Sequence, residues 1–228
     1  MFIPIGDDNT GRRTAPIVTV CLLVANVAVF LLELAQGDQI QQFVERWSVV
    51  PKEYADWKDI PPTIPLPFWF TTLSAMFMHG GWMHLGGNML YLWIFGDNVE
   101  DAMGRGRFLV FYLLCGVAAT AAQILVDPSS TVPNLGASGA IAGVLAGYVA
   151  LFPRQRVRVL MFRTITYVPA LVVIGLWILL QLVQGIGQIA ATRQTGGGGV
   201  AYMAHVGGFA AGFALVFLFR RRRGEEPA

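Results

Sequence analysis

The segment that could carry covalent chemistry runs from Asn134 to Ala140 and reads Asn-Leu-Gly-Ala-Ser-Gly-Ala. It follows a polar, proline-containing stretch and leads directly into an apolar run that ends at Phe152. Ser138 is therefore expected in the first turn of a helix, where backbone N–H groups are unpaired and the positive end of the helix dipole lies. Because such donors can stabilise an oxyanion, Ser138 is a candidate acyl-transfer nucleophile that still needs a base.

The chain that must position this serine is apolar and weakly charged. Of its 228 residues, 55% are hydrophobic and 13% are charged, against roughly a quarter charged in soluble domains, and the mean hydropathy is +0.57. Several apolar runs approach the ~20 residues that cross a bilayer. We therefore predict an all-α, polytopic membrane protein with six transmembrane helices, folded as one domain over residues 1–228. Cys21 and Cys115 each lie inside an apolar run and are expected to be buried structural thiols.

The segments outside the predicted helices differ in character. Residues 1–14 are short and polar, residues 36–80 are rich in tryptophan and proline and should lie at the membrane interface, and residues 220–228 form a basic tail. A linker, Gly196–Gly199, precedes the last helix, and the first helix is expected to be retained rather than cleaved as a signal peptide. The predicted helices are Pro16–Ala35, Trp82–Val99, Phe108–Val126, Ala137–Phe152, Ile165–Ala190 and Val200–Phe219.

The distribution of Lys and Arg predicts the orientation. With six spans both termini share one side, and twelve of the sixteen basic residues fall on that side. The positive-inside rule then places both termini in the cytoplasm. The basic runs beside the spans suit anionic lipid headgroups, so Arg220–Arg223 is interpreted as a topology anchor and no nucleic-acid partner is expected. The four basic residues on the opposite side are Arg46, Lys52, Lys58 and Arg193.

The base that Ser138 needs is expected on a different helix. In a six-span topology the second, fourth and sixth helices all run from the outer face inward. His84 and Asn88 lie four residues apart in the second helix and share a face. His205 lies about 8 Å along the sixth helix, at a depth similar to that of Ser138.

Small residues predict which helices meet. Gly139, Gly143 and Gly147 repeat every four residues on the fourth helix, and small residues at this spacing allow close helix approach in lipid. On the sixth helix Gly208 and Gly212 share a face with His205. The imidazole should therefore approach the helix that carries Ser138.

Two other classes of protein could show the same polar groups. His79, His84 and His205 could bind zinc and leave one coordination position open, but a spacing of five puts the first two about 140° apart on a continuous helix, and no neighbouring carboxylate supplies a base. A small transporter could also have polar helix ends within the membrane, but the chain shows no clear inverted repeat.

The combination of motifs resembles the rhomboid family of intramembrane serine proteases. The matching elements span residues 79–212: His79-Gly-Gly-Trp-Met-His84-Leu-Gly-Gly-Asn88, Glu100-x3-Gly104-x3-Phe108, Gly136-Ala-Ser138-Gly139 and Ala204-His205-Val-Gly-Gly208-x3-Gly212. The resemblance implies a six-helix bundle and a Ser–His dyad, with Ser138 as nucleophile and His205 as general base. It also implies an oxyanion site made by His84, Asn88 and the backbone at Gly136–Ser138, with His79 in a structural role.

The same resemblance implies that the substrates are transmembrane proteins, and that no cofactor or metal is needed. The expected location is a bacterial plasma membrane, with the catalytic groups open to the extracytoplasmic side; a catalytically inactive relative that only binds membrane proteins is the alternative. Two positions depart from the family pattern. The first loop has Trp69-Phe70-Thr71 in place of an aromatic–Arg pair, and Ala142 stands where many members have an aromatic residue that stacks on the catalytic imidazole.

Overall fold

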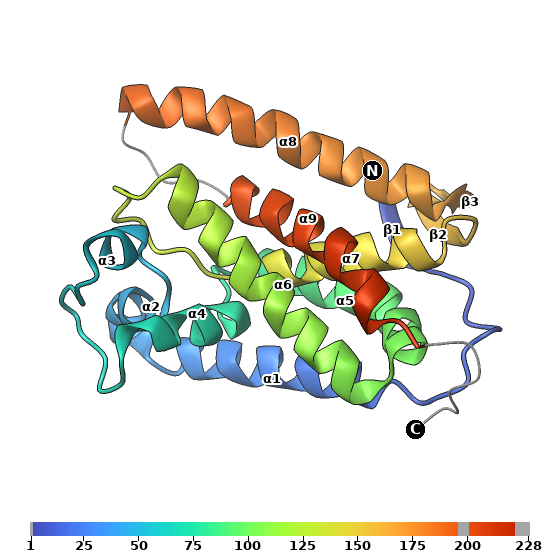
Figure 1. Ribbon diagram of the computed structural model, residues 1–228, viewed down its shortest axis with the longest axis horizontal. Coiled ribbons are helices and arrows are strands. Elements are labelled where there is room, and N and C mark those ends of the chain that lie inside the picture. Colours follow the sequence, from blue (N-terminus) through green and yellow to red (C-terminus); the bar gives the residue numbers. More distant parts are fainter. Residues whose placement is uncertain (1, 196–200, 222–228) are drawn as a thin grey trace.

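Long helices dominate the computed structural model, which describes residues 2–195 and 201–221 (Figure 1). The chain is a mostly helical bundle with one small sheet at one end. The predicted Gly196–Gly199 linker, Val200 and residues 222–228 of the tail lie outside the described residues. The six long helices are α1 (Ile17–Leu34), α5 (Trp82–Met103), α6 (Arg105–Val126), α7 (Ser138–Leu151), α8 (Ala170–Thr195) and α9 (Tyr202–Phe219).

Helix α7 occupies the centre of this bundle. Every residue from Gly139 to Tyr148 is buried, and α5, α6 and α9 pack around it. A helix that is apolar on all sides requires such partners on all sides. Its 14 residues span about 21 Å, less than the ~30 Å of a bilayer core, so at least one of its ends lies within the membrane.

The crossing of α7 and α9 is as close as the glycines predicted. A Cβ atom added at Gly208 would overlap the carbonyl group of Gly139, and one at Gly212 would overlap the backbone of Gly143. The backbones of the two helices are therefore in direct contact. Gly147, one turn further along α7, faces Phe111 of α6.

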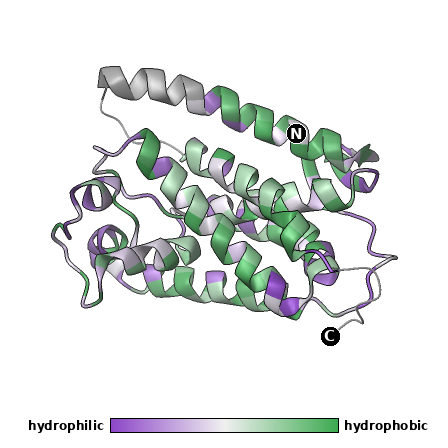
Figure 2. Cartoon of the chain, in the orientation of Figure 1, coloured by the Kyte–Doolittle hydropathy of each residue, from purple (hydrophilic) through white to green (hydrophobic). Residues whose placement is uncertain are grey.

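The outer surface of the bundle is apolar. Figure 2 shows that hydrophobic residues predominate along the long helices, and large apolar side chains such as Leu31, Val110 and Leu218 are exposed. Within the described residues, α1, α6 and α9 are long and apolar enough to cross a membrane, and Ser138–Leu151 and Ala170–Gly185 are shorter apolar helices. Helix α5 is 22 residues long but carries Asp97, Glu100 and Asp101 near its end. The protein is therefore an integral, multi-pass membrane protein.

Helix α1 contacts the bundle through a single face. Its buried side chains include Leu22, Asn26 and Phe30, at the spacing of one helical stripe. Cys21 lies off this stripe and is exposed, so the prediction that it is buried is wrong, whereas Cys115 on α6 is buried as expected.

A three-stranded antiparallel sheet covers one end of the bundle and was not predicted. The strands are β1 (Phe2–Gly6), β2 (Arg156–Met161) and β3 (Thr164–Pro169), in the order β1-β2-β3. The fifth long helix therefore begins at Ala170 rather than at Ile165. Residues 164–168 read Thr-Ile-Thr-Tyr-Val, and β-branched and aromatic residues favour a strand. In β2 the side chains alternate, with Val157 and Val159 buried.

Hydrogen bonds attach the polar N-terminal segment to the same end. The Tyr148 hydroxyl donates to Asp7 (2.7 Å), Arg12 pairs with Asp97 (2.6 Å), and Thr14 donates to Asp101 (2.6 Å). Burial raises the pKa of the Asp7 carboxyl to about 6, although its hydrogen bonds act in the opposite sense.

The first and last described segments of the chain lie at the same end of the bundle. The backbone N–H of Arg221, just after α9, donates to the carbonyl of Ala102 at the end of α5 (3.0 Å). Strand β1 pairs with β2 at this end of the bundle (Figure 1). Strand β1, the residue after α9 (Arg221) and the basic 154–163 segment thus share one end of the described structure.

The long first connection folds into short helices over the opposite end. These are η1 (Gly37–Gln39), α2 (Ile40–Trp47), α3 (Pro51–Asp56), η2 (Phe68–Phe70), α4 (Thr71–Ser74) and η3 (Ala75–Phe77). Two backbone hydrogen bonds join Val49 and Asn134 (3.0 and 2.7 Å), and the N–H of Gly136 donates to the carbonyl of Ala75 (2.8 Å). This connection therefore fixes the backbone that leads into α7.

Candidate active site

Ser138 and His205 meet between α7 and α9. Ser138 is the first residue of α7, and His205 lies in the first turn of α9 and is 7% exposed. The Ser138 Oγ and the His205 Nε2 are 2.7 Å apart, which is hydrogen-bonding distance. The close glycine crossing of α7 and α9 makes this distance possible. The structure thus brings together the two residues that the sequence singled out as a pair.

The other ring nitrogen of His205 contacts a residue that the sequence analysis missed. The Nδ1 atom lies 2.6 Å from Oε1 of Gln181 on α8. A carboxamide oxygen can only accept a hydrogen bond, so Nδ1 carries the proton and Nε2 presents its lone pair to the serine hydroxyl. The available signal was a glutamine inside an apolar run, where polar side chains are costly and often functional.

Aromatic rings from α8 and α9 surround the imidazole. The Trp177 ring lies 5.6 Å from the His205 ring, tilted by 40°, and the Tyr202 ring lies 6.4 Å away, edge-on. Ala142 is fully buried in α7 and provides no ring. The imidazole is therefore packed against an aromatic residue from α8.

Gly136 leaves an open space between Ser138 and His84. A Cβ atom added at Gly136 would lie 2.9 Å from Nε2 of His84 and 3.5 Å from Oγ of Ser138, and the φ angle of Gly136 is +130°. The His84 Nδ1 accepts a hydrogen bond from the N–H of Gly80 (3.3 Å), so in the neutral ring Nε2 carries the proton. This N–H donor is directed towards the space above Gly136.

Asn88 lies one turn further along α5. Its side chain is buried, and its Nδ2 atom has no protein hydrogen-bond partner within the described part of the chain. Buried amide groups are normally hydrogen-bonded, so a free amide donor is a candidate for contact with a substrate.

His79 lies outside this group and has a different environment. Its backbone N–H, rather than its ring, donates to the Glu33 carboxylate of α1 (3.1 Å), and its ring packs edge-on against His84 at 5.2 Å. Burial lowers the pKa of the His79 ring to about 4, so the ring is neutral at pH 7. Within residues 2–195 and 201–221, no three His, Cys, Asp or Glu side chains converge as metal ligands would.

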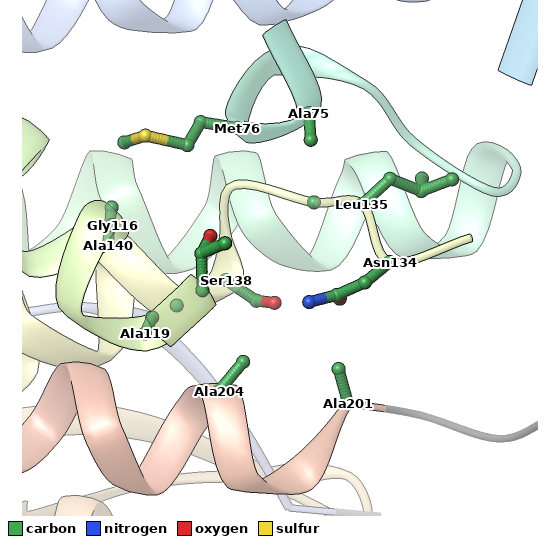
Figure 3. Close-up of a pocket in the computed structure, with 13 residues that line it drawn as sticks. Ala75, Met76, Gly116, Ala119, Asn134, Leu135, Ser138, Ala140, Ala201 and Ala204 are labelled. Carbon is green, nitrogen blue, oxygen red and sulfur yellow. The ribbon is translucent and has the colours of Figure 1, made fainter. Parts of the chain in front are cut away.

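A small pocket adjoins Ser138 (Figure 3). Small side chains from α6, α7 and the start of α9 form most of its wall, and the backbone before Ser138 completes it. In Figure 3 the Asn134 amide and the methyl groups of Ala201 and Ala204 border it. The lining residues are Ala75, Met76, Gly116, Ala119, Thr120, Asn134, Leu135, Gly136, Ser138, Gly139, Ala140, Ala201 and Ala204.

The chain matches a known protein family. The family model of the Rhomboid domain matches residues 67–222, which is more than half of the chain. The chain belongs to the rhomboid family. The match confirms the resemblance inferred from residues 79–212. All candidate site residues of this rhomboid chain lie within the matched region.

Several curated rhomboid proteins are similar to the chain. Rhomboid protein 1, mitochondrial, of Saccharomyces cerevisiae is 29% identical over 191 residues, covering 82% of this chain and 49% of that protein. Rhomboid protease GluP of Bacillus subtilis is 34% identical over 148 residues, covering 64% and 25%. RHOMBOID-like protein 4 of Arabidopsis thaliana is 27% identical and covers 91% and 53%. The chain thus spans about half or less of the length of these relatives.

Proposed function

We propose that this rhomboid chain is an intramembrane serine endopeptidase with Ser138 as nucleophile and His205 as general base. The observation that carries the proposal is the 2.7 Å separation between Ser138 Oγ and His205 Nε2. The protonated Nδ1, held by Gln181, supports the proposal because it leaves Nε2 free to accept the serine proton. The relative named Rhomboid protease GluP is consistent with this chemistry.

The reaction would proceed through an acyl-enzyme. Ser138 Oγ attacks the carbonyl carbon of the substrate peptide bond while its proton passes to His205 Nε2. The tetrahedral intermediate collapses as His205 returns that proton to the leaving amine nitrogen, and the C–N bond breaks. Water then loses a proton to His205 and attacks the ester carbonyl. Finally, the proton returns to Ser138 Oγ and the new carboxyl terminus leaves.

The negative charge of the tetrahedral intermediate would lie above Gly136. The Nε2–H of His84 is directed to this space, and the Asn88 Nδ2 group has no hydrogen-bond partner among the described residues. The backbone N–H at the start of α7 is unpaired within its own helix. Donors fixed in place before the reaction stabilise such an oxyanion strongly. Any side chain at residue 136 would fill the position that the oxyanion needs.

The proposed substrates are transmembrane proteins embedded in the same lipid. Their helices must unwind near the cleaved bond, because a helical carbonyl is engaged in its own hydrogen bond. The alanine- and glycine-lined pocket beside Ser138 favours a small residue before the cut. Helix α8 and the first connection are the two elements that could move to admit the substrate.

We also propose that residues 1–228 form a single membrane domain. Both of its termini are cytoplasmic, and its catalytic groups open to the extracytoplasmic side of the membrane. Strand β1, Arg221 after α9 and the basic 154–163 segment lie at one end of the bundle, which supports this orientation. A bacterial plasma membrane remains our prediction for the location; relatives named for mitochondria and relatives from plants show that the family is not confined to that membrane.

The proposal is tested by incubating the purified chain in proteoliposomes with single-span reporter proteins. The reporters carry a small residue within a helix that is weakened by glycine. We expect two fragments whose new termini map within or beside the span, at an unchanged rate in the presence of a strong zinc chelator. Absence of cleavage of every reporter by the folded protein would support the inactive alternative, and inhibition by the chelator would support the zinc alternative.

Replacing Asn88 with alanine tests the oxyanion site. We expect kcat to fall by about 10²–10³-fold with little change in KM, because a donor to the oxyanion acts mainly in the transition state. Initial cleavage rates over a range of reporter concentrations measure both constants. Asn9→Ala, near the opposite end of the bundle, is the matched control. Equal kcat values for folded Asn88→Ala and Asn9→Ala would show that Asn88 does not stabilise the oxyanion.

A further inference from the structure

We propose that Gln181 is a positioning residue that orients the His205 imidazole for proton transfer, so that helix α8 completes the dyad. This inference rests on the proposed function, because it assigns Gln181 a role towards the catalytic base. It extends the two-residue dyad by a third side chain, whose hydrogen bond is made to the base His205.

The first support is the hydrogen bond itself. Gln181 Oε1 lies 2.6 Å from Nδ1 of His205, and Nε2 on the far side of the ring lies 2.7 Å from Ser138 Oγ. A neutral imidazole has one proton, which can reside on either nitrogen. An acceptor at Nδ1 selects the tautomer in which Nε2 is unprotonated. Without that acceptor the ring could present an N–H to the serine, and this form cannot take up the serine proton.

The second support is the packing of the ring. Trp177 precedes Gln181 by four residues, so both side chains lie on the same face of α8. The Trp177 ring is 5.6 Å from the imidazole and 6.4 Å from the ring of Tyr91 on α5. Helix α8 therefore supplies both a hydrogen bond and an aromatic contact to His205, whereas Ala142 of α7 supplies no ring.

The third support is the way in which α8 joins the bundle. Val173 and Ile174, near its first turn, are buried, but Leu179, Leu180 and Val183 on its outer face are exposed. Between Trp177 and Gly185, the helix contacts its neighbours along the face that carries Trp177 and Gln181. A displacement of this half of α8 would remove the Nδ1 acceptor and the aromatic contact together. The base would then be oriented only when α8 is packed against α9.

The test compares Gln181→Leu with Gln184→Leu in proteoliposomes containing the reporter. Gln184 lies on the same helix, and its side chain is exposed. For Gln181→Leu we expect kcat to fall by about 10- to 100-fold, because the ring loses an orienting hydrogen bond, while KM changes by less than about twofold. Gln184→Leu should match the wild type. Gln181→Glu restores an oxygen acceptor and should be faster than Gln181→Leu.

The outcomes separate this inference from the function on which it rests. If the wild type cleaves and folded Gln181→Leu has the same kcat as Gln184→Leu, the positioning role is wrong and the dyad stands. If the wild type cleaves no reporter, the proposed function fails first. Should Gln181→Leu not fold, Gln181→Asn decides, because its shorter side chain withdraws the acceptor but keeps the carboxamide. A kcat equal to that of Gln184→Asn would overturn the proposal, and a lower kcat with unchanged KM would support it.

Discussion

Ser138→Ala is expected to abolish cleavage of transmembrane reporters while the bundle remains folded. The Ser138 Oγ is the only serine oxygen that hydrogen-bonds to a histidine within the described residues. Its removal eliminates the acyl-enzyme route, and the loss of kcat should be about 10⁴–10⁶-fold, as in other serine hydrolases. Initial rates and the thermal midpoint of the purified variant measure both parts of the prediction. The midpoint should stay close to that of the wild type, because alanine differs from serine by one atom.

His205→Ala is the partner variant, and Ser129→Ala is the matched control. Ser129 is exposed, and its hydroxyl contacts Asp127 in the segment before α7. Residues that act as one unit have strongly non-additive effects, so the double variant of Ser138 and His205 should be no slower than the slower single variant. Cleavage at the wild-type rate by Ser138→Ala would refute the assignment of the nucleophile.

Gly212→Ala is expected to destabilise the bundle and to disrupt the dyad together. A Cβ atom at residue 212 would overlap the backbone of Gly143, which cannot move aside as a flexible side chain can. Helices α7 and α9 must then separate. We expect the free energy of unfolding to fall by about 3 kcal/mol, at the upper end of the usual overpacking cost. Cleavage should also fall, because Ser138 and His205 lie on the two helices that move apart.

The control for this variant is Gly106→Ala. Gly106 is also in a long helix, α6, but an added Cβ atom there meets no other atom within 4 Å. Alanine favours a helix over glycine by about 1 kcal/mol, so this control should be as stable as the wild type or slightly more stable. Denaturant unfolding in detergent compares the two variants. Equal stability of Gly212→Ala and Gly106→Ala would show that the helices are not in backbone contact at this crossing.

The sequence was sufficient to pair Ser138 with His205 because both residues carry strong local signals. Each stands near the start of a glycine-rich helix, and the alternation of spans makes those helices parallel. The small residues Gly208 and Gly212 on the His205 face then predicted that α9 packs closely against the glycine-rich helix α7. The contacts at Gly139 and Gly143 agree with this prediction.

The contacts of Trp177 and Gln181 with His205 could not be predicted from the same patterns. Helix α8 is apolar on most sides, so hydrophobicity does not indicate which of its faces meets α9. That rotation is set by packing with α9 and by the hairpin before α8. The hairpin itself was missed because Ile165, Tyr167 and Val168 extend the apolar run of the following helix. The pairing of β1 with β2 joins residues far apart in the chain, and no local signal specifies such contacts.

Covalent labelling of the wild-type protein tests the central claim most directly. A fluorophosphonate reacts with a serine only when a neighbouring base removes the serine proton, so it reports the dyad without requiring a substrate. The purified protein is incubated with the reagent in detergent or in lipid, digested, and examined by mass spectrometry to locate the adduct. We predict one phosphonylated residue, Ser138, and no adduct in His205→Ala. An adduct on another residue, or an unmodified Ser138 in the folded wild type, would contradict the account.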